Sequence, residues 1–266
     1  MFGSCLIGSE LLLPSPWAVV RSFCGLAQTT EFYRSILHTL LRVAAGFAAG
    51  MAAGLLAGTL TAFSRVADVL LTPLKNIIKA TPVTSFIVLI LLYFSSNVTP
   101  SAVAFLAVLP ICWSNVCEGL RQTDKKMTEL AHAYAFGRKK TLREIYFPAV
   151  RPYLSAAATT GLGFAWKSCV AAEVIALSKN SVGRALYESK LYLETAELFA
   201  WTASVVLISV LFEKLLVHKL FKNKNTEGAA GRRSESLEHG HASCEVELQY
   251  KSDAYAEYGR DEERNI

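Results

Sequence analysis

The chain has 266 residues, of which 52% are hydrophobic and 18% are charged, and its formal net charge is +5. This composition is too apolar for an ordinary soluble domain, and the charges are unevenly spread. No Asp, Glu, Lys or Arg lies between Val43 and Ser64 or between Ala80 and Cys117. Because crossing the hydrocarbon of a bilayer takes about 20 helical residues, these stretches predict an all-α, polytopic membrane protein with about five spans.

The N-terminal region, residues 1–35, is expected to precede the membrane domain. Residues 16–34 predict a short amphipathic helix at the membrane interface, and the first span follows from Ile36 to about Ala62. Glycines recur at every fourth residue of this span, so they lie on one stripe of the helix. Such a stripe lets a second helix pack closely in a membrane. The four glycines are Gly46, Gly50, Gly54 and Gly58.

Prolines mark the next part of the chain. A second span is expected over about Ile77–Phe94, with a kinked and partly polar entry, because Pro73 and Pro82 oppose a continuous helix. A third span is expected over about Ser101–Cys117. A charged segment, residues 118–151, then carries eight Lys or Arg and four Asp or Glu.

The remaining spans complete a membrane domain over residues 36–217. The fourth is expected over about Pro152–Ala172 and the fifth over about Leu198–Val217, joined by a polar connection. The tail, 218–266, is polar and poor in aliphatic residues, so we expect it to be disordered. The protein is expected in the plasma membrane. The positive-inside rule then places the 118–151 segment and the tail on the cytoplasmic side.

The charged segment itself has helical patterning. A helix is expected from Asp124, as the N-terminal cap, to Ala135, with Gly137 as its C-terminal stop. A second short helix, Lys139–Tyr146, is expected to end before Pro148. Two short helices with apolar residues beside charges suit docking into a groove of a partner protein. The alternative is a basic loop that binds anionic lipid headgroups.

This segment resembles the EAA loop of ABC-transporter importer permeases. The family pattern is Glu-Ala-Ala, three residues, Gly, nine residues, Ile, one residue and Leu-Pro. Glu129 and Pro148 stand at the two ends of this pattern, and Ala135 replaces the family's glycine. The stretches "ELLLPSP", "KATPVTSF", "GLGFAWKSCVAAEVIA" and "LYLETAELFAWT" also resemble the nitrate/sulfonate/taurine-type branch, so the resemblance covers about Glu10 to Leu216.

The resemblance implies a type I permease core like that of methionine importers, with no enzymatic activity. Two permease subunits, expected here as a homodimer in the bacterial inner membrane, would form the solute pathway. A separate cytoplasmic ATPase would bind ATP, so this chain needs no cofactor, and an extracytoplasmic binding protein would deliver a nitrate, sulfonate or taurine-like solute. No metal or nucleic acid is expected to bind. The implied ATPase-docking residues are Glu129, Leu130, Ala131, Ala133, Tyr134, Ala135, Phe136, Gly137, Ile145 and Pro148.

Two charges near the fourth span are candidates for the solute pathway. Charges inside a span are costly and often functional. Lys167 could attract an anionic solute, snorkel to the outer interface, or pair with Glu173.

Other interpretations stay open at this point. A secondary transporter or channel usually places carboxylates or histidines inside its spans, and the two uncharged stretches contain none. Members of the resembled family usually have another span before "ELLLPSP", so an N-terminally truncated, non-functional permease is a further alternative.

Overall fold

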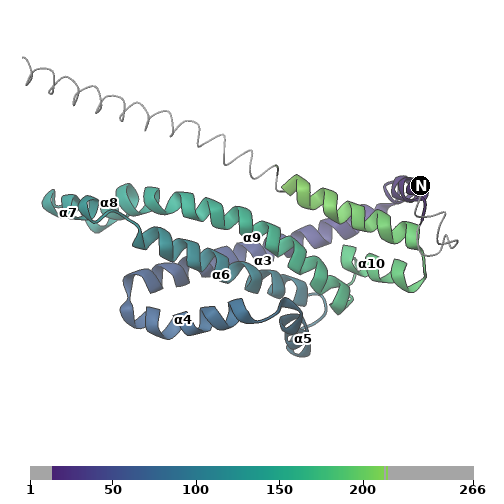
Figure 1. Cartoon of the computed structure of the whole chain (residues 1–266), viewed down its shortest axis with the longest axis horizontal. Helices are drawn as coiled ribbons and strands as arrows, with labels where there is room; N and C mark the ends of the chain where they lie inside the picture. The colour runs from purple at the N-terminus through teal and green to yellow at the C-terminus, as the bar shows by residue number, and fades with distance from the viewer. Residues whose placement is uncertain (1–13, 213, 215–266) are drawn as a thin grey trace, which may run out of the picture. The chain divides into compact units, whose positions relative to one another are not determined.

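The computed structural model describes residues 14–212 and 214, and all regular structure in this part of the chain is helical. The predicted disordered tail, 218–266, lies outside the described residues. The prediction of an all-α fold is confirmed. In chain order the elements are α2 (Pro16–Leu26), α3 (Thr30–Phe63), α4 (Arg65–Ala80), α5 (Val83–Tyr93), α6 (Thr99–Arg121), α7 (Lys125–Ala133), α8 (Arg138–Thr141), the π turn η1 (Leu142–Tyr146), α9 (Phe147–Ala176) and α10 (Val182–Leu191), followed by the helix Thr195–Phe212 (Figure 1).

Three helices in the described part of the chain are long and apolar enough to cross a membrane, namely α3, α6 and Thr195–Phe212. The pair α4–α5 makes a fourth if it counts as one bent span. The expected number was about five. The difference lies in α9, which has 30 residues but packs between α3, α6 and α10, where enclosed positions need not be apolar.

The second predicted span, Ile77–Phe94, is wrong as a single kinked helix. The chain breaks between α4 and α5, and the two helices are bent by 104°. Thr81 has extended backbone angles and Pro82 caps α5. The physical reason is that a residue before proline is pushed out of the helical region. Pro73, by contrast, is accommodated inside α4.

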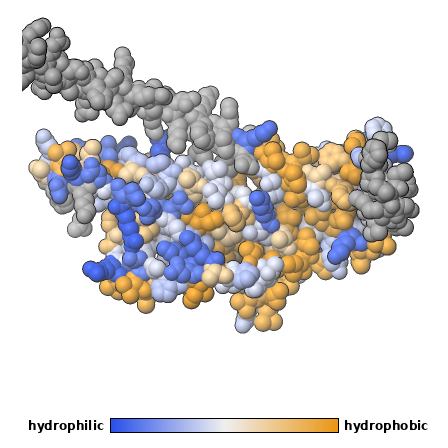
Figure 2. Space-filling view, in the orientation of Figure 1, coloured by the Kyte–Doolittle hydropathy of each residue, from blue (hydrophilic) through white to orange (hydrophobic). Residues whose placement is uncertain are grey.

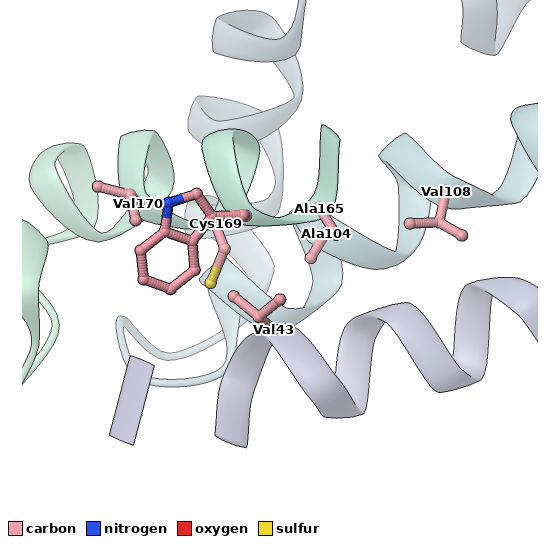
Figure 3. Packing of buried hydrophobic residues seen from close by; sticks show 7 residues of the cluster. Val43, Ala104, Val108, Ala165, Cys169 and Val170 are labelled. Atoms are coloured by element: carbon pink, nitrogen blue, oxygen red, sulfur yellow. The ribbon is translucent and has the colours of Figure 1, made fainter. Parts of the chain in front are cut away.

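The core lies where α3, α6 and α9 meet. Val43 of α3, Val108 of α6 and Cys169 of α9 belong to one buried cluster, and Figure 3 shows their side chains between the three helices. Because these three helices share one core, they form the frame that positions both ends of the molecule.

The glycine stripe of α3 lies against α6. All four glycines are buried. A methyl group on Gly46 would lie 2.4 Å from the carbonyl oxygen of Ser101, and one on Gly54 would lie 2.6 Å from the Cβ of Cys112. Real side chains do not approach this closely, so the contact between α3 and α6 requires residues without a Cβ at these positions.

Candidate functional site

The charged segment forms a helical projection, residues 122–146, between the ends of α6 and α9 (Figure 1). The Asp124 carboxylate accepts the backbone N–H of Lys126 at 2.9 Å, which caps α7 as predicted. The turn after α7 is closed by the N–H of Phe136, which donates to the carbonyl of Ala131 at 2.8 Å. Ala135 has a left-handed backbone with φ of 51°. This residue therefore occupies the position of the αL cap that usually ends a helix.

The structure corrects the role predicted for Gly137. Its carbonyl accepts the N–H groups of Lys140 at 2.9 Å and Thr141 at 3.1 Å, so it starts α8 and does not end α7. The second short helix also does not end before Pro148. The chain continues from α8 through the π turn η1 directly into α9. The π turn ends two residues before Pro148, whose ring does not fit a regular i to i−4 hydrogen-bond ladder.

The projection exposes large apolar side chains. Met127 and Leu130 of α7 and Tyr134, the residue that follows it, are exposed at spacings of three and four residues, which places them on one face. Lys140 places its ammonium group 4.0 Å from the ring centroid of Phe136, a cation–π contact that holds the turn against α8. An exposed apolar face of this kind, bordered by basic residues, is typical of a docking surface.

The predicted docking residues divide by exposure. Ala131 is only 3% exposed, so it faces inward and supports the turn. Phe136 and Ile145 are half-buried. The exposed ones are Glu129, Leu130, Ala133, Tyr134, Ala135, Gly137 and Pro148.

Two tight contacts hold the roots of the projection. A methyl group on Gly119, near the end of α6, would lie 2.8 Å from the Tyr153 ring of α9. The rings of Tyr146 and Phe63 meet edge to face, with centroids 5.3 Å apart. These contacts join the projection to the ends of α3, α6 and α9. A movement of the projection would therefore displace the ends of all three helices.

At the end of the helix frame opposite the projection, a buried polar cluster surrounds Glu173. The Glu173 carboxylate is fully buried. Its oxygens accept the Thr39 hydroxyl at 3.0 and 2.9 Å, the Arg42 guanidinium at 2.9 Å and the backbone N–H of Gly183 at 3.3 Å. Three segments, α3, α9 and the start of α10, therefore meet at one carboxylate.

Arg42 extends this cluster to the loops. Its guanidinium also donates to the carbonyl of Lys179 at 2.9 Å and to the side-chain oxygen of Asn97 at 3.4 Å. Asn97 in turn accepts the N–H of Lys179 at 3.0 Å. The cluster thus fixes the turn between α5 and α6 and the connection between α9 and α10.

The structure separates the two residues proposed for the solute pathway. Glu173 pairs with Arg42 and not with Lys167. Lys167 is exposed on the outer side of α9. Sequence reasoning missed Arg42 and Thr39. The available signal was that Arg42 is a charge inside the first predicted span, where it needs a partner.

The comparison with known families agrees with this architecture. The family of binding-protein-dependent transport system inner membrane components matches residues 50–218, which is more than half of the chain. The chain belongs to this family. It is a permease component of the ABC-transporter type, and it is a multi-pass membrane protein.

Relatives of this permease point to its branch. It is 26% identical to the aliphatic sulfonates transport permease protein SsuC of Bacillus subtilis, over 85% of this chain and 83% of that protein. It is 27% identical to SsuC of Escherichia coli, over 78% and 76%. It is 30% identical to the riboflavin transport system permease protein RibX of Chloroflexus aurantiacus, over 77% and 80%. The resemblance to nitrate/sulfonate/taurine-type permeases is confirmed.

A solved structure shares the fold. The permease superposes on a chain of an amino acid ABC transporter crystallised with histidines, with a TM-score of 0.60 and 15% identity, over 73% of this chain and 93% of that one. At this identity the likeness supports the fold alone.

Proposed function

We propose that this permease is the membrane subunit of an ATP-driven importer for a small, anionic solute. Residues 129–148, within the charged segment 118–151, dock it onto a separate cytoplasmic ATPase, which binds the ATP. A second copy of the chain completes the pathway, and an extracytoplasmic binding protein delivers the solute. Permeases of this family work in general with an ATPase and a binding protein, which supports these partners.

One observation carries the docking assignment. Met127 and Leu130 of α7, with Tyr134 directly after it, are exposed to solvent on a projection that is fixed to the helix frame by the contacts at Gly119 and Tyr146. An exposed apolar face on a firmly rooted helix gives a partner both a surface to bind and a means to move the frame. Figure 2 shows hydrophilic residues gathered at this end of the molecule, as expected for a part outside the membrane.

The solute class is supported by the names of two relatives. Both SsuC proteins are named for aliphatic sulfonates, which are anions. RibX is named for riboflavin, so the same fold serves solutes of different chemistry. For this chain we propose a sulfonate-like or related oxyanion, with Lys167 as the pathway candidate that the sequence suggested; Glu173 is occupied by Arg42, Thr39 and Gly183.

The docking assignment is tested by co-purification of the tagged permease with its ATPase from membranes. Glu129→Arg and Ala133→Glu change exposed residues of α7 and are expected to reduce the recovered ATPase at least about tenfold, as lost interface anchors do. Glu31→Arg is the matched control, since it makes the same charge change on an exposed residue of α3.

The amounts of ATPase recovered with the four proteins distinguish three outcomes. Recovery with wild type and Glu31→Arg but not with the two α7 variants supports docking through the projection. Equal recovery with all four proteins places docking elsewhere. No recovery with wild type contradicts the importer assignment.

A further inference from the structure

Helix α4 has its polar side toward the protein. Asp68, Thr72 and Lys75 share one face by their spacing of four and three residues, and all three are half-buried. The opposite face is apolar and exposed. It carries Val66, Val69, Leu70, Leu74 and Ile77. A surface helix of a soluble protein has the reverse arrangement, with its apolar stripe toward the core. The pattern of α4 fits a helix with an apolar medium outside and water on its inner side.

Contacts with α6 fix the position of this polar face along that helix. The Asp68 carboxylate lies 2.6 Å from the Arg121 guanidinium at the end of α6. Lys75 lies 5.7 Å from the ring centroid of Trp113, eight residues earlier in α6. Helix α4 therefore runs antiparallel to a helix that can cross the membrane. At a rise of about 1.5 Å per residue, Lys75 lies about 15 Å along α4 from its first residue, Arg65.

The polar face of α4, together with Arg121 of α6, carries more positive than negative charge. Asp68 is neutralised by Arg121 and also accepts the Thr72 hydroxyl at 2.9 Å. The Trp113 indole N–H already donates to Thr61 at 2.6 Å, so its ring is held in place. Within residues 14–212, Lys75 has no hydrogen bond or ion pair, and its contact is with the Trp113 ring. Lys75 lies near enough to Asp68 to interact with its charge, but Arg121 already pairs with that carboxylate, so the face carries one positive charge in excess. An excess cation beside a helix that can cross the membrane is costly and is often functional.

We propose that the polar face of α4 lines the solute path and that Lys75 attracts the anionic solute into it. The ligand is an oxyanion, such as a sulfonate, which gains charge attraction from Lys75. This assigns a specificity residue that is distinct from Lys167. It rests on the proposed importer function, since it concerns the solute that such an importer carries.

Cysteine labelling tests this without knowledge of the natural solute. The full-length chain is prepared in membranes with its native cysteines replaced, and Thr72→Cys is introduced. Its rate of reaction is measured with the anionic reagent methanethiosulfonate ethylsulfonate and with its cationic trimethylammonium counterpart. The measured quantity is the ratio of the anionic to the cationic rate, with and without Lys75→Gln.

We expect Thr72→Cys to be labelled and the rate ratio to fall at least about fivefold when Lys75→Gln is added, because one charge at this distance acts on both reagents in opposite directions. Lys79→Gln is the matched control, since it removes an equal charge from an exposed position one turn further along α4. It should leave the ratio within about twofold. Leu74→Cys, on the outward apolar face, should react at least about tenfold more slowly, because a thiol in lipid does not ionise.

Three results would overturn the proposal. These are no labelling of Thr72→Cys, an unchanged ratio after Lys75→Gln, or an equal fall after Lys79→Gln. Labelling needs neither the ATPase nor a substrate, so its failure is separate from a failure of the co-purification experiment.

Discussion

The Glu173 carboxylate receives hydrogen bonds from Thr39, Arg42 and Gly183 and has no access to solvent. Three donor groups, the Thr39 hydroxyl, the Gly183 N–H and the ion-paired Arg42 guanidinium, compensate for the loss of hydration of this charge. Gly183 is required there, because a methyl group on it would lie 2.4 Å from the Cβ of Glu173. The carboxylate therefore joins α3, α9 and α10, which is a structural task that leaves it little capacity to bind a passing solute.

Glu173→Gln tests whether this carboxylate stabilises the fold. The change leaves the Arg42 charge, 14% exposed, without its counter-charge. Breaking a fully buried pair costs about 3–5 kcal/mol, so the cost here lies at or below the lower end of that range. We expect a lower midpoint in thermal unfolding of the detergent-solubilised permease. Glu188→Gln is the control, because Glu188 pairs with Arg184 four residues earlier, with both side chains more than 40% exposed. Exposed pairs contribute at most about 1 kcal/mol. Equal midpoints for the two variants would contradict the structural role of Glu173.

At the scale of elements, the close contact of α3 with α6 depends on glycine. A methyl group on Gly54 would lie 2.6 Å from the Cβ of Cys112 and 2.9 Å from the carbonyl of Leu109, so Gly54→Ala forces the two helices apart. Overpacking of this kind costs about 1–3 kcal/mol. Gly163→Ala in α9 is the control, because a methyl group there meets nothing within 4 Å.

The two glycine variants are compared by thermal unfolding in the same detergent. Gly54→Ala should lower the midpoint. Gly163→Ala should keep or raise it, because alanine is the better helix former. A midpoint for Gly54→Ala at or above that of the wild type would show that the contact between α3 and α6 tolerates a side chain.

Sequence periodicity was enough to place the apolar parts of α3 and α6, because glycines at every fourth residue and an uncharged run are local signals. It misplaced the start of α3: the helix predicted over 16–34 ends at Leu26, and α3 begins at Thr30. The break between α4 and α5 was harder to predict. It depends on Thr81 before Pro82, and the rule that a pre-proline residue avoids the helical region predicts a kink and a full break equally well. In the structure the two helices are bent by 104°, and Ile87 and Ile90 of α5 share a buried cluster with Val103 of α6 and Ala172 of α9, a long-range contact that no local pattern reveals.

The site was predictable only where its signals are local. The Asp124 cap and the amphipathic α7 followed from neighbouring residues. The left-handed turn at Ala135 did not, because glycine is the usual residue for that conformation and Gly137 stood two positions away. The pairing of Arg42 with Glu173 joins residues 131 positions apart, and no local pattern reveals such a pair.

At the scale of the whole described chain, α9 connects the projection at one end of the helix frame to the Glu173 cluster at the other. It runs without interruption from the π turn at the root of the projection to Glu173, and at about 1.5 Å per residue its 30 residues span about 45 Å. Movement of the docked projection would therefore reach the Glu173 cluster through one rigid helix. This arrangement requires that the projection and α10 lie on opposite sides of the membrane, and Figure 1 places them at opposite ends of the helix frame.

Side-specific labelling tests that orientation. In a background without native cysteines, Lys139→Cys and Lys190→Cys each place one thiol on an exposed position, the first on the projection and the second on α10. By the positive-inside rule the segment 118–151 faces the cytoplasm, so a membrane-impermeant maleimide added to intact cells should label Lys190→Cys alone. Inverted membrane vesicles should give the reverse result. Labelling of both thiols from the same side would mean that α9 does not cross the membrane, and the route from the ATPase to the Glu173 cluster would fail with it.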